Sequence, residues 1–122
     1  MQPAEVIILD GGMGHLLRRK GVEVTGEIGS IGRFLGVAMA NLQKPHLVKE
    51  AHEEYIMAGA QVITTNSYSC VPSVVGGSEA IQVIKAAGVI AREVADKNHV
   101  KVAGCLPPLR ESYRPDRVAS EA

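Results

Sequence analysis

Three short runs of apolar and β-branched residues divide the chain, and residues that end strands follow each run. The runs are residues 6–9 (Val-Ile-Ile-Leu), 61–65 (Gln-Val-Ile-Thr-Thr) and 100–103 (Val-Lys-Val-Ala). Near-continuous apolar runs of this length are typical of strands that are buried on both faces of a parallel sheet. The pattern therefore predicts three parallel strands.

Two longer segments between these runs have apolar residues at three- and four-residue steps, which is the pattern of an amphipathic helix. One begins at Pro45, a favoured first-turn residue, and ends before Gly59. The other runs from about Ser78 to about Lys97, with Gly88 expected to mark a close approach to a neighbour. Its predicted apolar stripe consists of Ile81, Ile84, Ala87, Ala91 and Val94.

The remaining segments complete a βαβ series. A shorter helix is predicted over residues 13–20, ended by Gly21, and residues 26–36, which contain four glycines, are predicted to form a loop. Residues 114–118 resemble the opening of another helix. The order strand, helix, loop, helix, strand, long helix, strand predicts an α/β fold with right-handed crossovers.

A sheet of three parallel strands leaves two exposed edges, which natural folds normally cover or close. The edges, together with a helix opening so near Ala122, indicate that residues 1–122 are the front part of a larger fold. The alternative is a small open α/β sandwich with a frayed tail.

Composition excludes several classes of function. The 13 Lys+Arg balance the 13 Asp+Glu, so no net charge favours nucleic acid or an anionic membrane, and aromatic residues are only 3%, too few for a base-stacking platform. No apolar run approaches the roughly 20 residues of a membrane span, and no secretory signal is visible at the start. A cytoplasmic location is expected.

The candidate site lies where the predicted strands end, because ligands of parallel α/β folds bind at the carboxyl ends of the strands. Asp10 is suited to an ammonium group, and Thr65 with Asn66 to a carboxylate or amide. Gly11 lets a ligand approach the backbone closely. Each residue also has a structural interpretation, since Asp caps helices and Thr-Asn is common in turns. The convergence of strand ends is what favours a binding site.

Other candidate chemistry is not supported by the spacing. The glycines at 11, 12 and 14 fit neither a dinucleotide fingerprint nor a phosphate loop, and Asp10 would repel a phosphate. The four histidines have no metal-ligand spacing, and a packed or surface position is expected for His52. Cys70 and Cys105 lack the paired spacing of a structural zinc site.

Three stretches together resemble the homocysteine S-methyltransferase family. They are residues 8–14 (Ile-Leu-Asp-Gly-Gly-Met-Gly), 58–68 (Ala-Gly-Ala-Gln-Val-Ile-Thr-Thr-Asn-Ser-Tyr) and 103–108 (Ala-Gly-Cys-Leu-Pro-Pro), and residues 109–116 continue the match. The resemblance spans nearly the whole chain in order. It covers only the first portion of the family domain.

The resemblance implies a (β/α)8 TIM barrel, of which this chain would supply the first three strands, so that residues 1–122 form the N-terminal part of a homocysteine-binding domain. Family members transfer a methyl group from an activated donor, such as S-methylmethionine, S-adenosylmethionine or betaine, to homocysteine, giving methionine. A zinc ion held by three cysteine thiolates binds the homocysteine sulfur and lowers its pKa.

By the same resemblance, Asp10 is expected to bind the homocysteine amino group, and Gly11, Thr65 and Asn66 to line the pocket. The zinc cysteines belong to later strands, so this chain is expected to hold neither metal ligands nor catalytic residues. The sequence departs from relatives at residues 30–32, where they often have a Trp-Ser-Ala-like segment, and at His15, which replaces Thr or Arg.

The sequence thus predicts a truncated zinc-dependent methyltransferase, inactive alone, whose partners are homocysteine and a methyl donor. The alternative function is a non-catalytic α/β module that self-associates through its exposed sheet edges. A free-standing small-molecule binder of the open-sheet type is a third hypothesis.

Overall fold

The computed structural model describes residues 4–26, 30–109 and 116. Two three-residue strands pair in parallel, with Ile63 opposite Val102, and a long helix connects them. The predicted α/β character and the parallel sheet are therefore confirmed. In chain order the elements are α1 (Met13–Arg19), α2 (Ile31–Gln43), α3 (Pro45–Met57), β1 (Val62–Thr64), α4 (Pro72–Val75), α5 (Gly77–Asn98) and β2 (Lys101–Ala103).

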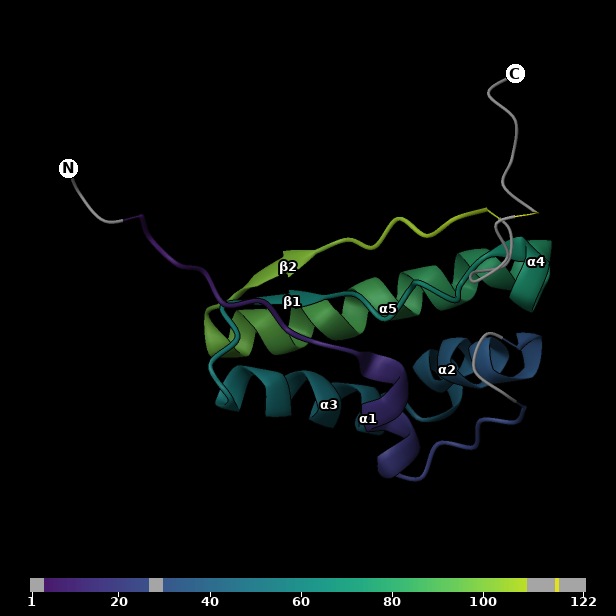
Figure 1. The fold of residues 1–122 in the computed structure, drawn as a ribbon, viewed down its shortest axis with the longest axis horizontal. Helices are drawn as coiled ribbons and strands as arrows, with labels where there is room; N and C mark the ends of the chain where they lie inside the picture. Colours follow the sequence, from purple (N-terminus) through teal and green to yellow (C-terminus); the bar gives the residue numbers. More distant parts are fainter. Residues whose placement is uncertain (1–3, 27–29, 110–115, 117–122) are drawn as a thin grey trace, which may run out of the picture.

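Helices cover one face of this small sheet. Both α3 and α5 pack against β1, and α5 also packs against β2 (Figure 1). Ile63 is fully buried beneath them, whereas Lys101 is exposed. The prediction of strands buried on both faces is wrong for the described residues, because their helices form a layer on one side only.

The predicted first strand, residues 6–9, is an extended segment that pairs with β1 at one bridge, Leu9 to Val62. Its backbone is tied down where Gln61 N donates to the Ile8 carbonyl at 2.8 Å. Val6 and Leu9 remain 79% and 64% exposed. The expected buried strand is wrong because no layer of the described residues covers these side chains.

The largest departure from the sequence prediction is α2, since residues 26–36 were expected to form a loop. Helix α2 begins at Ile31, and the Ser30 hydroxyl caps it by accepting a hydrogen bond from Arg33 N at 3.4 Å. The glycines are explained by packing: a Cβ on Gly32 would lie 2.7 Å from Thr25 Oγ1, and one on Gly36 would collide with the Glu23 carbonyl. They allow the helix to lie close to residues 23–25.

The other predicted helices are confirmed. Helix α1 ends before Gly21 and α3 ends before Gly59, and both glycines adopt positive φ, at 100° and 113°. The predicted helical opening at residues 114–118 lies, apart from Asp116, outside the described residues.

The predicted stripe on α5 is confirmed at Ala87, Ala91 and Val94, which are buried, and is wrong at two isoleucines. Ile81 and Ile84 are 58% and 47% exposed. A Cβ on Gly88 would meet nothing within 4 Å, so the expected close approach at this glycine is also wrong. The buried residues are Ala80, Val83, Ala87, Ile90, Ala91, Val94 and Ala95.

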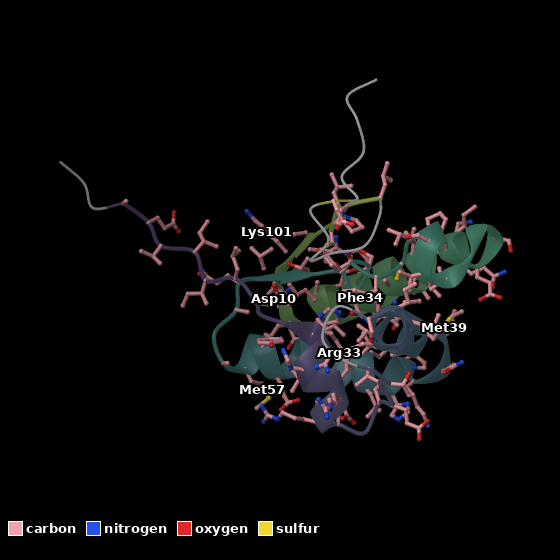
Figure 2. The ribbon with its side chains drawn as sticks, turned by 45° about the vertical axis from the view of Figure 1, so that its right-hand side comes forward. Asp10, Arg33, Phe34, Met39, Met57 and Lys101 are labelled. Atoms are coloured by element: carbon pink, nitrogen blue, oxygen red, sulfur yellow. The ribbon has the colours of Figure 1, made fainter. Side chains whose placement is uncertain are left out.

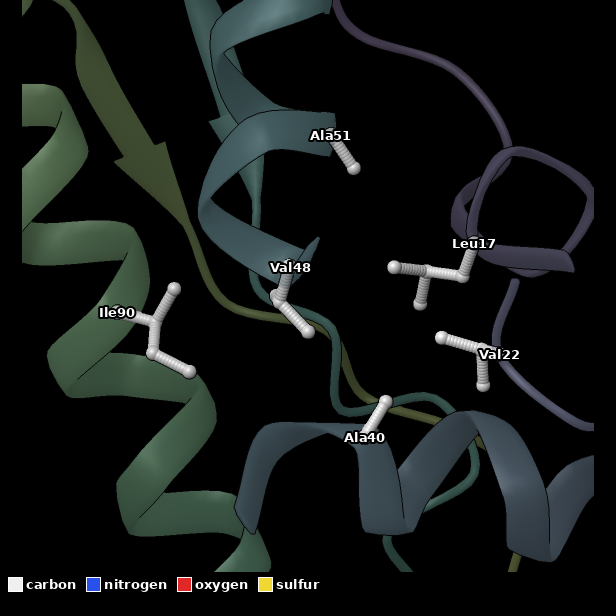
Figure 3. Packing of buried hydrophobic residues seen from close by; sticks show 6 residues of the cluster. All are labelled: Leu17, Val22, Ala40, Val48, Ala51 and Ile90. Carbon is white, nitrogen blue, oxygen red and sulfur yellow. The ribbon is translucent and has the colours of Figure 1, made fainter. Parts of the chain in front are cut away.

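The main core lies between the helices and joins segments that are distant in sequence. It brings together α1, α2, α3 and α5 (Figure 3). The core residues are Leu17, Val22, Ala40, Val48, Ala51 and Ile90.

None of the helices in the described part of the chain is long and apolar enough to cross a membrane.

Candidate functional site

A cavity of about 360 Å³ lies where the carboxyl end of β1 meets the beginnings of α1 and α2. Its wall consists of residues 11–15, residues 64–66, residues 68–69, three residues of α2 and Cys105. Three of the four predicted site residues, Gly11, Thr65 and Asn66, line this cavity. The carboxyl ends of the strands thus converge as the sequence predicted.

Asp10 stands beside the cavity and is anchored by Thr64. Its carboxylate accepts hydrogen bonds from Thr64 N at 2.7 Å and from the Thr64 hydroxyl at 2.9 Å. A carboxylate has about four acceptor positions. Two positions of Asp10 are therefore left for a further donor, such as an ammonium group, while the side chain is held in place.

The Gly11-Gly12 segment is shaped by Tyr55 of α3. The Tyr55 hydroxyl donates to the Gly12 carbonyl at 2.6 Å, and a Cβ on Gly11 would lie 3.1 Å from the Tyr55 ring. Burial and the nearby Asp10 carboxylate raise the pKa of Tyr55, which favours the protonated, donating form. A side chain at position 11 would therefore press against the Tyr55 ring, which favours glycine there.

Thr65 ties the cavity wall to the end of β2. Its hydroxyl accepts from Cys105 N at 3.2 Å and shares a hydrogen bond of 2.8 Å with the Ser67 hydroxyl. Thr65 N also donates to the Ala103 carbonyl at 2.9 Å. This residue holds the two strand ends together in addition to lining the cavity.

Asn66 joins the strand end to α2 through a buried pair of amides. Its Nδ2 donates to the Val37 carbonyl and to Asn41 Oδ1, both at 3.1 Å, and Asn41 Nδ2 donates to the Asn66 carbonyl at 2.8 Å. Asn66 is only 6% exposed. Its amide nitrogen and its peptide oxygen both hold α2 and the strand end together, which leaves the side-chain oxygen as the polar atom of Asn66 that could contact a ligand.

Arg33, Phe34 and His15 also line the cavity and were not predicted as site residues. Figure 2 shows Arg33 and Phe34 on the side of α2 nearer to Asp10. Arg33 and Phe34 were missed because residues 26–36 were interpreted as a loop. Ser30, a favoured N-cap residue placed directly before Ile31, is the sequence signal that could have located this helix.

The thiols do not form a metal site. Burial raises the pKa of Cys70 to about 11 and also raises the pKa of Cys105, so both side chains are thiols near neutral pH. Among residues 4–26, 30–109 and 116, no group of three or more His, Cys, Asp or Glu side chains could hold a metal ion. This part of the chain therefore does not supply a ligand set for a zinc ion.

Comparison with known proteins places this arrangement among methyltransferases. The family model described as "Homocysteine S-methyltransferase" matches residues 7–121. The chain is 30% identical over 95 residues to Homocysteine S-methyltransferase 1 from Zea mays, covering 74% of this chain and 27% of that relative. It is 29% identical over 68 residues to Homocysteine S-methyltransferase 1 from Saccharomyces cerevisiae, covering 54% of this chain and 21% of that relative.

A solved structure has a similar fold. The Homocysteine Methyltransferase MmuM from Escherichia coli, in its metallated form, aligns with a TM-score of 0.68 at 24% identity, over 86% of this chain and 38% of that chain. The chain is much shorter than the relatives it matches: it spans 27% of the Zea mays relative and 21% of the Saccharomyces cerevisiae relative.

Proposed function

The chain belongs to the homocysteine S-methyltransferase family, and from this premise we propose that its cavity is the part of the active site that binds homocysteine. The observation that supports the proposal is the meeting of Gly11, Thr65 and Asn66 around one cavity, with the anchored carboxylate of Asp10 beside it. The strands would be the opening strands of a (β/α)8 barrel, in which ligands bind at this end.

In the proposed complex, Asp10 accepts hydrogen bonds from the homocysteine ammonium group. Gly11 leaves room for the substrate backbone, and Thr65 with Asn66 forms the adjoining wall. In the reaction proposed for the complete family domain, the homocysteine sulfur bonds to the methyl carbon while the donor's bond to that carbon breaks. The electron pair of that bond stays with the donor, and the proton of the thiol passes to solvent. We propose an onium donor of the S-methylmethionine, S-adenosylmethionine or betaine type.

Activation of the sulfur is not assigned to residues of this chain. Zinc would supply it in the whole family domain, but the described residues do not fit a zinc site. We therefore propose that this chain binds homocysteine and forms no methionine by itself. An assay of the chain with zinc, homocysteine and each donor in turn tests this statement, and formation of methionine would contradict it.

Isothermal titration of the chain with homocysteine tests the binding proposal. The Asp10→Asn variant keeps an acceptor for Thr64 N but loses the charge, and binding should weaken about tenfold, as for a lost charged hydrogen bond. Asp96→Asn is the matched control, because Asp96 is exposed and ion-paired with Arg92 on α5. Equal affinities for the wild type and Asp10→Asn would overturn the role of Asp10.

A second candidate function is assembly through the sheet edge. The observation that favours it is the exposure of the apolar residues 6–9 beside β1. Sedimentation analysis of the chain and of an Ile7→Lys variant tests it, since edge pairing predicts a dimer that the lysine disrupts. A wild-type monomer at all concentrations would exclude this candidate.

A further inference from the structure

Two basic residues in the cavity wall are not used in side-chain ion pairs or hydrogen bonds within the described part of the fold. His15 of α1 and Arg33 of α2 both line it. Among the residues that the structure describes, neither side chain forms an ion pair or a side-chain hydrogen bond, although four other ion pairs are present. The cations of these four ion pairs are Lys20, Lys49 and Arg92, all outside the cavity wall.

The surroundings of Arg33 make an anionic ligand the natural partner. Arg33 is half-buried, and the same cavity wall includes the apolar side chains of Met13, Phe34 and Val37. A guanidinium in partly apolar surroundings gains most from a planar anion, because its parallel N–H groups match the two oxygens of a carboxylate. Phosphate is less suitable, since the carboxylate of Asp10 stands at the same cavity.

We infer that Arg33, with His15 in the same cavity wall, binds the carboxylate group of an amino-acid ligand in this cavity. The inference rests on the proposed function and deepens it, because Asp10 and Arg33 then recognise the two opposite charges of one zwitterion. Homocysteine and the proposed methyl donors all carry a carboxylate. Arg33 could therefore bind the carboxylate of homocysteine or that of the methyl donor, and the experiment below distinguishes the two.

The test compares homocysteine with two analogues that each lack one charged group, under reducing conditions. The thiol 3-aminopropane-1-thiol lacks the carboxylate, and 4-sulfanylbutanoate lacks the amino group. Binding is measured by NMR from the Arg33 Nε–H signal and the backbone amides of residues 11–15. In the wild type, homocysteine and 4-sulfanylbutanoate should shift the Arg33 signal, whereas 3-aminopropane-1-thiol should not.

The Arg33→Gln variant should bind homocysteine about tenfold more weakly and 3-aminopropane-1-thiol as the wild type does. Arg33→Lys keeps the positive charge but loses the parallel N–H groups of the guanidinium, so its affinity for homocysteine should lie between those of the wild type and Arg33→Gln. This intermediate affinity would also show that the weaker binding of Arg33→Gln does not come from a failure to fold. Arg92→Gln is the control and should bind like the wild type, because Arg92 lies exposed on α5. If Arg33→Gln weakens S-methylmethionine but not homocysteine, the carboxylate belongs to the donor.

The outcomes separate this inference from the proposed function. Wild-type binding of homocysteine with no loss in Arg33→Gln for homocysteine or S-methylmethionine would overturn the inference and leave the function intact. Binding of 4-sulfanylbutanoate at Arg33 without binding of homocysteine would support the carboxylate site and overturn the homocysteine proposal. If homocysteine shifts the amides of residues 11–15 and no carboxylate ligand shifts the Arg33 signal, the inference alone is overturned. If homocysteine shifts neither set of signals, the homocysteine proposal is overturned as well.

Discussion

Thr64 holds Asp10 with both its backbone N–H and its hydroxyl, at 2.7 Å and 2.9 Å from the two carboxylate oxygens. The residues are far apart in sequence, and their contact fixes the extended N-terminal segment to the end of β1. The proposed ammonium-binding group is therefore oriented by the sheet before any ligand arrives, which lowers the entropic cost of binding.

Thr64→Val removes the hydroxyl and keeps the side-chain shape. We expect a loss of about 1 kcal/mol of unfolding free energy, because a partly exposed hydrogen bond to a charged group is lost while the backbone bond remains. Thr64→Ser is the control that retains the hydroxyl. Urea unfolding measures both variants, and equal destabilisation of the two would contradict a role for the hydroxyl.

The two glycines after Asp10 should respond differently to alanine. Gly11→Ala places a Cβ 3.1 Å from the Tyr55 ring and should displace the Tyr55 hydroxyl from the Gly12 carbonyl, costing about 1–2 kcal/mol by overpacking. Gly12→Ala is the matched control, since its Cβ would meet nothing within 4 Å. Thermal unfolding distinguishes them, and equal melting temperatures would show that Tyr55 does not constrain Gly11.

His52 should make the fold sensitive to acid. It is fully buried, and neither ring nitrogen has a hydrogen-bond partner among the described residues. Burial lowers its pKa below the ordinary 6.5, while the Asp10 carboxylate acts weakly in the opposite direction. The unfolded chain therefore binds the proton first, and stability should fall as the pH drops from 6.5 toward the lower folded pKa.

His52→Leu should flatten this dependence between pH 7.5 and about 5, because no buried imidazole remains to be protonated. His46→Gln is the control and should keep the wild-type slope, since His46 is exposed at the start of α3. Urea unfolding at several pH values measures the slope. A wild-type slope in His52→Leu would assign the acid sensitivity to another group.

Glycines in two helices should also respond in opposite directions. Gly88→Ala should stabilise the chain by about 0.5–1 kcal/mol, because the site in α5 is open and alanine is the better helix former. Gly36→Ala should destabilise it, since its Cβ would collide with the Glu23 carbonyl under α2. Denaturant midpoints report both, and destabilisation by Gly88→Ala would mean that α5 has a close neighbour there.

The sequence predicted what depends on local chemistry. Helix α3 begins at Pro45 and ends before Gly59 because these residues act within their own turns. The convergence of Thr65 and Gly11 follows from the rule that parallel strands end at one edge. These features need no knowledge of distant partners.

The features that were missed depend on tertiary contacts. Gly32 and Gly36 have poor helix propensity, and only their packing on residues 23–25 explains a helix there. On α5, Ile84 is exposed and Val83 buried because the packing of the helix against α2 and α3 decides which of its faces is covered. Arg33 was missed as a site residue because its helix was missed.

Equilibrium dialysis of the chain against homocysteine and zinc, separately and together, tests the central claim most directly. The claim is that this chain carries the amino-acid-binding part of the site without the metal centre. It predicts saturable binding of one homocysteine per chain, unchanged by zinc, and no zinc retained. Absence of homocysteine binding, or stoichiometric zinc that strengthens homocysteine binding, would contradict it.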